Sequence, residues 1–308
     1  MISVRGLRKS YGELEAVRGI DLDVAEGEVF AFLGPNGAGK TTTVEILEGY
    51  RPRNGGDVAV LGVDPASPTR AWRSRVGLVL QECRLTPELT VTEAVAQYAG
   101  YYERPRDVAD TVRLVGLEGK EDTRTSRLSG GQQRRLDVAL ALVGDPDLLF
   151  LDEPTTGFDP SARRQAWRVI SSLRDLGKTV FLTTHYMDEA QALADRVAIL
   201  RAGEIVAEGP PDRLGDRRER ASEISFRLGG VAEAADLPVA VRDRARIDGV
   251  AVTIAAPDPV PLLRKLTGWA LERGIELGDL EVRRPSLEDI YLELTDGADD
   301  DAAEGEGG

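Results

Sequence analysis

The sequence lacks a second cysteine and any long apolar run. Cys83 is the single cysteine among 308 residues, so no disulfide can form within the chain, and a reducing compartment is its simplest setting. No apolar run approaches the roughly 20 residues that a membrane-spanning helix needs. Residues 1–5 also lack the apolar core of a secretion signal. By itself the chain is therefore expected to be cytosolic and soluble.

The sequence is also poor in positive charge. Its 39 basic residues are outnumbered by 53 acidic ones, which leaves a formal net charge of -14 and a pI near 4.8. Because nucleic-acid binding depends on Lys and Arg side chains that neutralise phosphates, we expect no nucleic-acid partner. A hydrophobic content of 42% is ordinary for a globular protein, and the length suits one large domain and a smaller one.

The most informative stretch of the chain is residues 34–42. It reads Gly34-Pro35-Asn36-Gly37-Ala38-Gly39-Lys40-Thr41-Thr42 and fits G-x-x-x-x-G-K-[ST], the pattern of a phosphate-binding loop. A strand is predicted before it, at 28–33, and a helix after it, at 41–48, as such a loop requires. Glycine N–H groups and the helix N-terminus favour anions, Lys40 adds charge toward the β- and γ-phosphates, and the Thr41 hydroxyl can bind Mg²⁺. The chain is therefore expected to bind a nucleoside triphosphate.

The elements around this loop indicate a nucleotide-binding domain over about residues 1–210. Residues 1–33 are predicted to form strands, because apolar and acidic residues alternate around residue 22. From about residue 85 to 145 the apolar spacing becomes helical, which indicates a helical insertion. The predicted elements are strands at 58–61 and 75–80, helices at 91–102 and 108–115, and a helix after Gly131.

The second half of this domain alternates strands and helices. Apolar runs at 147–151 and 179–183 are predicted to be buried strands, and Asp159-Pro160 supplies a cap and a first-turn proline for the helix between them. Residues 196–208, interrupted by Ala202-Gly203, are typical of a β-hairpin. The alternation predicts an α/β fold with a largely parallel sheet, whose ligand binds at the carboxyl ends of the strands.

A smaller unit is predicted after a charge-dense boundary at about residues 209–220. Its predicted elements are strands at 224–228 and 250–254 and helices at 261–273 and after Ser286, which can cap the last helix. These elements indicate a small α+β domain over 221–295. Residues 296–308 are acidic and glycine-rich without a bulky apolar side chain, so we expect them to be disordered.

A second anion-binding segment lies in the helical insertion. Leu128-Ser129-Gly130-Gly131-Gln132 begins a predicted helix, where the Ser129 hydroxyl and the glycine N–H groups can hold a phosphate. This segment matches the signature motif of the ATP-binding cassette (ABC) transporter ATPases, which the chain resembles over about residues 1–210. The features that match, in the family's order, are Tyr11, 34–42, Gln81, 128–132, 148–153, 156–159 and His185. The resemblance implies a mixed sheet with N-terminal antiparallel strands and a helical insertion.

The resemblance also implies how a phosphate-binding loop and a signature segment share one nucleotide. In the family two subunits associate head to tail, and the segment from Ser129 to Gln132 of one subunit covers the ATP bound to residues 34–42 of the other. We therefore expect a homodimer, with a heterodimer containing a different ATPase as the alternative.

Four polar residues are expected to carry the chemistry of hydrolysis. Asp152 ends a predicted strand and, as in the family, should contact Mg²⁺ through water. Glu153 follows directly and should polarise the attacking water; beside a phosphate loop this function is favoured over a solvated loop charge. The Gln81 amide can reach both Mg²⁺ and water, and in the family this glutamine links the nucleotide to the membrane partner. His185, the single histidine, follows strand 179–183, and in the family it holds the γ-phosphate.

Two further residues each keep two interpretations. Tyr11 lies in the predicted turn between the first two strands, where an exposed aromatic often has no function, while the resemblance implies that it stacks on adenine. Asp159 either only caps the following helix or also contacts nucleotide across the dimer. Phe158 replaces the leucine usual in the family and preserves an apolar side chain.

The resemblance implies an ATP-hydrolysing subunit that powers a separate membrane-spanning permease from the inner face of the membrane. A non-transport ABC ATPase acting on ribosomes or DNA is one alternative, and the acidic charge and single cassette argue against it. A regulatory module that dimerises with little hydrolysis is another, and the presence of Glu153 and His185 argues against it.

Two segments are similar to those of one subfamily, the ATPases of drug and antibiotic exporters of the daunorubicin-resistance kind. They are residues 47–50 and residues 283–295. The same subfamily also moves lipids, polysaccharides and sodium, so the transported compound is not predicted. The domain at 221–295 is expected to clasp the second subunit or to regulate the opening of the dimer; the alternative is a passive stabilising appendage.

Overall fold

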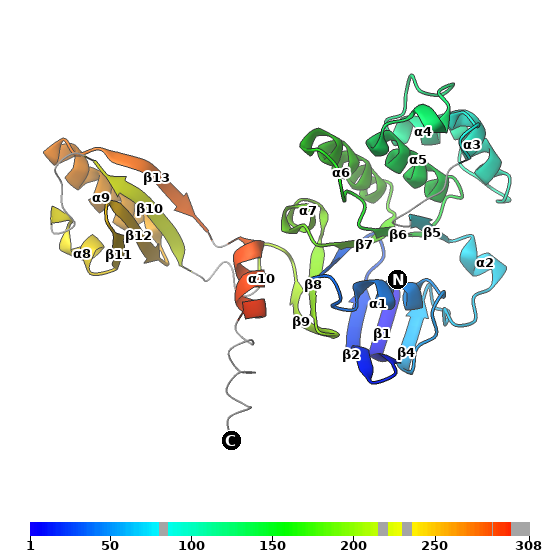
Figure 1. Ribbon diagram of the computed structural model, residues 1–308, viewed down its shortest axis with the longest axis horizontal. Helices are drawn as coiled ribbons and strands as arrows, with labels where there is room; N and C mark the ends of the chain where they lie inside the picture. The colour runs from blue at the N-terminus through cyan, green and yellow to red at the C-terminus, as the bar shows by residue number, and fades with distance from the viewer. Residues whose placement is uncertain (80–85, 215–220, 230–235, 285, 297–308) are drawn as a thin grey trace. The chain divides into compact units, whose positions relative to one another are not determined.

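The computed structural model describes residues 1–79, 86–214, 221–229, 236–284 and 286–296. Gln81, Cys83 and residues 297–308 of the expected acidic tail lie outside these ranges. The chain separates into two compact units, Met1–Pro211 and Asp212–Gly308, and each is described by itself (Figure 1). Within the described residues, no helix combines the length and the apolar composition that crossing a membrane requires.

The first unit begins with an antiparallel sheet of three strands in the order β2-β1-β4. The strands are β1 (Ile2–Tyr11), β2 (Leu14–Val24) and β4 (Gly55–Val60). In β2, Ile20, Leu22 and Val24 are buried, whereas Asp21 and Asp23 are exposed. The predicted alternation is therefore confirmed, and it gives this sheet one apolar face.

A larger sheet of six strands, in the order β5-β6-β7-β3-β8-β9, forms the centre of the first unit. Its strands are β3 (Val29–Leu33), β5 (Val76–Val79), β6 (Leu148–Asp152), β7 (Thr179–Thr184), β8 (Arg196–Arg201) and β9 (Glu204–Gly209). All neighbours are parallel except β8 and β9, which form the predicted hairpin. Because β3 and β6 are buried on both faces, they are almost continuously apolar in sequence, and the equally buried β7 has an apolar centre between threonines.

The helices of the first unit fall into two sets. Those beside the six-stranded sheet are α1 (Lys40–Leu47), α2 (Arg70–Arg73), α6 (Pro160–Asp175) and α7 (Met187–Leu193). The predicted helical insertion contains α3 (Val91–Ala99), α4 (Val108–Leu114), the 3₁₀ turn η1 (Thr125–Arg127) and α5 (Gly130–Leu142), grouped together in Figure 1. Helix α3 ends three residues earlier than predicted. Its chain turns after Ala99, and the ring of Tyr102 lies where a side chain on Gly144 would stand.

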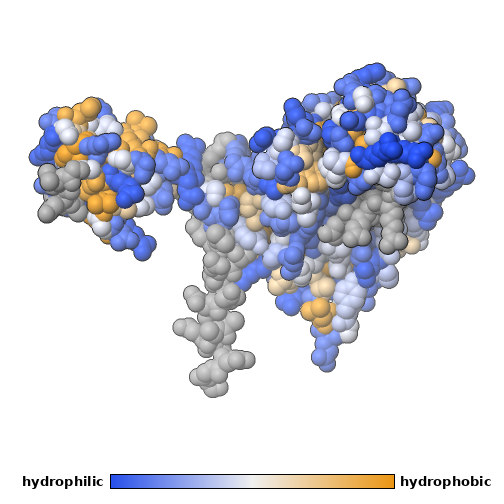
Figure 2. Space-filling view, turned by 45° about the horizontal axis from the view of Figure 1, so that its top comes forward, coloured by the Kyte–Doolittle hydropathy of each residue, from blue (hydrophilic) through white to orange (hydrophobic). Residues whose placement is uncertain are grey.

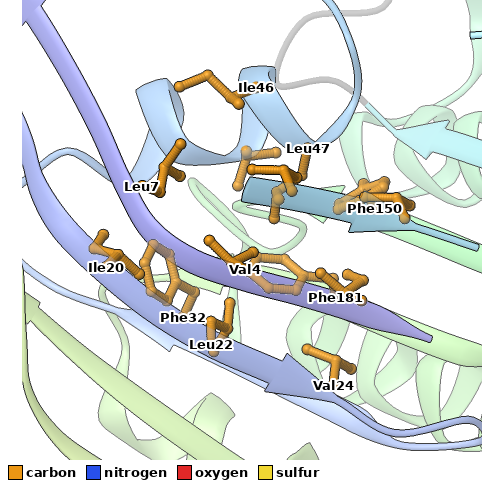
Figure 3. Close-up of a cluster of buried hydrophobic side chains, with 14 of the residues drawn as sticks. Val4, Leu7, Ile20, Leu22, Val24, Phe32, Ile46, Leu47, Phe150 and Phe181 are labelled. Carbon is orange, nitrogen blue, oxygen red and sulfur yellow. The ribbon is translucent and has the colours of Figure 1, made fainter. Parts of the chain in front are cut away.

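An apolar core between the two sheets supports the loops at the sheet edge (Figure 3). Phe30, Phe32, Phe150 and Phe181 come from three neighbouring strands and have no exposed surface. The Phe181 ring lies 5.6 Å from that of Phe30 and 5.6 Å from that of Phe150, measured between centroids. Burial of several aromatic side chains contributes strongly to stability, so the strand ends are held on a rigid base.

In its described residues, the second unit consists of an antiparallel sheet and three helices. The strands, in the order β11-β12-β10-β13, are β10 (Ser222–Leu228), β11 (Ala245–Asp248), β12 (Ala251–Ala256) and β13 (Leu277–Arg283). The helices are α8 (Val239–Arg242), α9 (Pro259–Arg273) and α10 (Leu287–Asp296). Alternate residues of β10 and β12 pack with α9 in one apolar core. This architecture confirms the α+β class predicted for the C-terminal region.

Caps set the beginnings of the long helices in the second unit. Asp258 accepts a hydrogen bond from the Val260 N–H at 3.2 Å, so α9 begins two residues before the predicted Pro261. Ser286 accepts one from the Asp289 N–H at 3.0 Å and caps α10 as predicted. Several apolar side chains remain exposed, among them Leu271 at 83%, and Figure 2 shows apolar surface on the visible face of this unit.

Candidate active site

The phosphate-binding loop, residues 34–42, joins β3 to α1, and its last three residues form the first turn of that helix. Gly39 has a φ of 104°, and a Cβ there would lie 2.4 Å from the carbonyl oxygen of Ala16. A Cβ on Gly34 would lie 2.5 Å from the carbonyl oxygen of Leu200. Both obstacles are backbone atoms that cannot move aside, so glycine is required at both positions.

The Lys40 side chain is buried against this loop. Its exposed fraction is 6%, and Nζ donates hydrogen bonds to the carbonyl oxygens of Gly34 at 2.7 Å and Pro35 at 3.1 Å. Burial lowers the pKa of Lys40, while the charges of Glu153 and Asp152 oppose that shift. The loop thus holds an incompletely neutralised cation, which favours an anionic ligand.

Asp152 and Glu153 lie at the carboxyl end of β6, where Thr183 of the neighbouring strand β7 contacts both. The Thr183 hydroxyl donates to Asp152 Oδ1, and the Glu153 N–H donates to that hydroxyl at 3.0 Å. Sequence reasoning missed Thr183. A threonine paired with an acidic residue across a parallel sheet becomes recognisable only when the strand order is known.

Glu153 and His185, both predicted to act in hydrolysis, are brought together at this edge. Glu153 Oε1 lies 3.4 Å from His185 Nδ1, and Glu153 Oε2 accepts a hydrogen bond from the Thr156 hydroxyl at 3.1 Å. The glutamate has a φ of 43°, a conformation that costs a non-glycine residue about 1–3 kcal/mol and is common at functional sites. The side chain is therefore held in one place by its neighbours.

Ser129 and Gln132 form a reciprocal cap at the start of α5. The Gln132 N–H donates to Ser129 Oγ at 3.4 Å, and the Ser129 N–H donates to Gln132 Oε1 at 3.0 Å. A Cβ on Gly130 would meet no atom within 4 Å, so packing within the chain does not explain this glycine. The helix N-terminus is formed and has open space beside it.

Asp159 caps α6 as predicted. Its Oδ1 accepts hydrogen bonds from the backbone N–H groups of Ser161 at 2.8 Å and Ala162 at 3.0 Å. These bonds, led by that of Ala162, lower the pKa of the Asp159 carboxyl. The capping interpretation is confirmed, and a contact across a dimer stays a prediction.

Tyr11 is the last residue of β1, one position before the turn in which it was predicted, and 41% of its surface is exposed. The Lys9 ammonium lies 5.3 Å and the Arg51 guanidinium 5.4 Å from the ring centroid. Arg51 also pairs with Glu45 of α1. These cations, which sequence reasoning missed, orient the ring beside the phosphate-binding helix.

Glu48, directly after α1, is a buried acid that sequence reasoning did not single out. Only 8% of its surface is exposed, and burial, with repulsion from Asp152 and Glu45, raises its pKa to about 8. The residue follows an apolar pair in a helix, and nothing in that pattern distinguishes a buried glutamate from an exposed one.

We expect stability to fall as the pH rises from the unfolded-state pKa of Glu48, 4.5, to its folded value of about 8. Across this window the folded chain retains a proton that the unfolded chain releases, and the shift corresponds to at most about 5 kcal/mol. In Glu48→Gln this loss should disappear, which urea unfolding at pH 5 to 9 without nucleotide would measure. Glu13→Gln, at an exposed position, is the control, and equal pH slopes in wild type and Glu48→Gln would contradict the expectation.

Comparison with protein families and known proteins gives consistent results. Residues 17–156 match the ABC transporter model, and residues 222–286 match the C-terminal domain model of ABC transporter domain-containing-like proteins. The Nod factor export ATP-binding protein I of Rhizobium meliloti (strain 1021) is 40% identical over 96% of this chain and 88% of its own length. Its namesake from Burkholderia orbicola (strain AU 1054) is 38% identical over 96% of both chains.

Two solved structures show the same nucleotide-binding fold. cbiO1 from Clostridium perfringens, part of the ABC transporter complex cbiONQ, matches with a TM-score of 0.63 and 28% identity, over 69% of this chain and 89% of its own. The dimeric cassette MJ0796, in a post-hydrolysis state with ADP and Pi, matches with a TM-score of 0.60 and 26% identity, over 68% and 98%. The phosphate-binding loop, the acidic strand end and these similarities agree, and the chain belongs to the ABC transporter family as an ATP-hydrolysing, ATP-binding subunit.

Proposed function

We propose that two copies of this chain form two ATP-hydrolysis sites head to tail and power export through a separate membrane-spanning permease. The observation that carries the proposal is the pairing of Glu153 with His185 at the sheet edge, 3.4 Å apart. The carboxylates of Glu153 and Asp152 also act electrostatically on Lys40 of the phosphate-binding loop. A cation for the triphosphate and a base for the water are thus parts of one site.

Mg²⁺ fits the side chains that this site offers. Mg²⁺ prefers hard oxygen ligands and usually takes only one or two from the protein, the rest coming from substrate phosphates and water. Thr41 offers a hydroxyl and Asp152 a carboxylate, and among the described residues no group of three or more His, Cys, Asp or Glu side chains could hold a metal. When bound, Mg²⁺ would neutralise charge on the β- and γ-phosphates, and Gln81 is the further ligand that we propose.

The other side chains of the site would each have a separate role in ATP binding or hydrolysis. Glu153 accepts the proton of the attacking water, a contribution worth about 10²–10⁴ in rate. His185, beside Glu153 Oε1, orients that water and the γ-phosphate. Lys40 and the N–H groups of residues 34–42 hold the triphosphate, and Tyr11 stacks on the adenine. All the proposed groups other than Gln81 lie in the part of the chain that the structure describes.

The nucleotide would be enclosed by the signature segment of a second subunit. Ser129 caps the start of α5 in the helical group, whereas residues 34–42 lead into α1. Figure 1 shows these two helices apart from each other. The helix N-terminus at Ser129 to Gln132 favours an anion and has open space beside Gly130. The similar cassette MJ0796 is dimeric, which supports a paired arrangement. Asp159, besides capping α6, would approach the partner's site.

A mixing experiment tests whether each site uses two chains. Lys40→Ala should inactivate the phosphate-binding loop and Ser129→Arg the signature segment, so each variant alone should show no ATPase activity. In a 1:1 mixture half of the dimers contain both variants and have one intact site of two, so about a quarter of the wild-type activity should return. The measurement is phosphate release after the mixed chains have exchanged subunits.

The same mixture can contradict the proposal. If each site lay within one chain, every chain in the mixture would carry a defect and no activity would return. A mixture of Lys40→Ala with Glu153→Gln is the matched control, because both substitutions damage the same half-site and the mixed dimer keeps no intact site.

We also propose the direction of transport and the place of action. Relatives that align along 96% of this chain are named export ATP-binding proteins, which supports export of drugs, antibiotics or other hydrophobic compounds. Because no helix of the described residues could cross a membrane, a separate permease would carry the compound. The chain would then work at the inner face of the cell membrane, with its second unit at 221–295 clasping the dimer.

A further inference from the structure

Glu189 is a buried acid for which the proposed mechanism has no role. It lies in the first turn of α7, and no part of its surface is exposed. Taking a carboxyl group out of water is costly, and an apolar side chain of similar size in such a place is often equally stable or more so. A contribution to stability therefore does not explain a glutamate at this position. The contacts of its carboxyl group indicate another reason.

The Glu189 carboxyl accepts hydrogen bonds from two other segments of the first unit, the loop after β6 and helix α6. Glu189 Oε1 accepts from the Thr155 hydroxyl at 2.9 Å and from the Trp167 indole N–H at 3.1 Å. Glu189 Oε2 is buried and makes no hydrogen bond with the described residues. Only one of the two carboxyl oxygens therefore has hydrogen-bond partners among them.

Glu189 and its donor Thr155 each lie close in the sequence to a residue of the proposed site. Thr155 follows Glu153 by two positions, and Glu189 itself follows His185 by four. The Thr184 hydroxyl accepts a hydrogen bond from the Tyr186 N–H at 3.0 Å, which links the two residues that flank His185. The carboxyl therefore bridges the two loops that carry the base and the histidine.

The second donor, Trp167, extends this bridge to α6. Trp167 belongs to the helix that Asp159 caps. The Thr155 carbonyl in turn accepts a hydrogen bond from the Phe158 N–H at 3.1 Å. One buried carboxyl thus ties together the segments that carry Glu153, Asp159 and His185, whose relative placement decides whether water can be activated.

We infer that Glu189 is a positioning residue for ATP hydrolysis, and this inference rests on the proposed roles of Glu153 and His185. Its hydrogen bonds hold the loop after β6 and the loop after β7 in register, so that Glu153 Oε1 and His185 Nδ1 stay 3.4 Å apart. Because its side chain is fully buried, it acts through these neighbours. Its loss should slow the chemical step and leave ATP binding by residues 34–42 intact.

The test separates kcat from KM in purified, full-length protein. Glu189→Ala should lower kcat by about 10- to 100-fold, since misplacement of catalytic groups by about 1 Å costs up to that much, while KM for ATP changes less than about twofold. Glu189→Gln keeps a carbonyl oxygen for Thr155 and Trp167 and should retain kcat within about threefold of wild type.

A matched control removes a buried side chain outside the bridge. Val169→Ala shortens a buried residue of α6 and should lower the melting temperature while kcat per folded chain stays at the wild-type value. If Val169→Ala loses as much kcat as Glu189→Ala, or if both Glu189 variants keep wild-type kcat, the inference is wrong. Should Glu189→Ala not fold, Thr155→Val removes one donor without changing shape and should lower kcat at constant KM; an unchanged kcat would then overturn the inference.

A different result would refute the proposed mechanism of hydrolysis. It is refuted if Glu153→Gln hydrolyses ATP at the wild-type rate, whatever the Glu189 variants do. A slow Glu153→Gln variant together with a fully active Glu189→Ala variant refutes the positioning role alone.

Discussion

Replacement of Glu153 by glutamine is expected to lower the rate of ATP hydrolysis by about 10²–10⁴-fold, the usual contribution of a positioned general base. The amide cannot accept the proton of the attacking water, whereas it retains the size of the carboxylate and can still accept the hydrogen bond from Thr156. The main-chain contact with Thr183 is unaffected. ATP affinity should therefore persist while turnover stops, which phosphate release and equilibrium binding would measure together.

The same variant should accumulate as an ATP-bound dimer. If hydrolysis reopens the dimer, a chain that binds ATP without cutting it will stay closed, and light scattering should show a doubled mass at saturating Mg-ATP. Glu153→Gln without nucleotide is the control and should remain monomeric. A strictly monomeric species at saturating Mg-ATP would refute the two-chain site, because the signature segment would then never cover a nucleotide.

Replacement of Lys40 by alanine should remove most of the affinity for ATP. Loss of a buried cation that pairs with an anionic ligand typically costs about 2–5 kcal/mol, which corresponds to a Kd at least about 30-fold higher. Titration calorimetry with ATP in the presence of Mg²⁺ would measure the change. The folded chain should not be weakened, because burial lowers the pKa of Lys40 and so disfavours its charge in the nucleotide-free protein.

An exposed lysine provides the control for this variant. Lys120 lies on the surface of the helical group, and Lys120→Ala removes the same charge from the chain without touching residues 34–42. Its ATP affinity should equal that of wild type. An unchanged affinity in Lys40→Ala, with an unchanged melting temperature, would contradict the assignment of residues 34–42 as the triphosphate site.

Much of the fold could be predicted because its signals are local. Strand β3, the glycine loop and α1 follow one another within twenty residues, and each is specified by its own side chains. The caps at Ser129, Asp159 and Ser286 were predictable for the same reason, since each bonds to N–H groups two or three residues away. Local patterning also predicted a largely parallel sheet and a separate α+β unit.

The order of strands could not be predicted, because it depends on contacts between distant segments. In the sheet β3 lies between β7 and β8, which are about 150 and 165 residues later in the chain. This arrangement brings Thr183 to Asp152 and His185 to Glu153. The sequence indicated that these residues end strands, and only their placement in one sheet made the strand ends neighbours.

The sequence by itself determined that the chain binds and cuts a triphosphate, because the loop at 34–42, the signature at 128–132 and the acidic pair at 152–153 each carry their chemistry in adjacent residues. The tertiary structure decided the electrostatics. Glu48 and Glu189 are of a residue type that usually lies at the surface, yet packing buries both side chains. Burial raises the pKa of each, because solvation of a charge depends on everything around it and not on its neighbours in the chain.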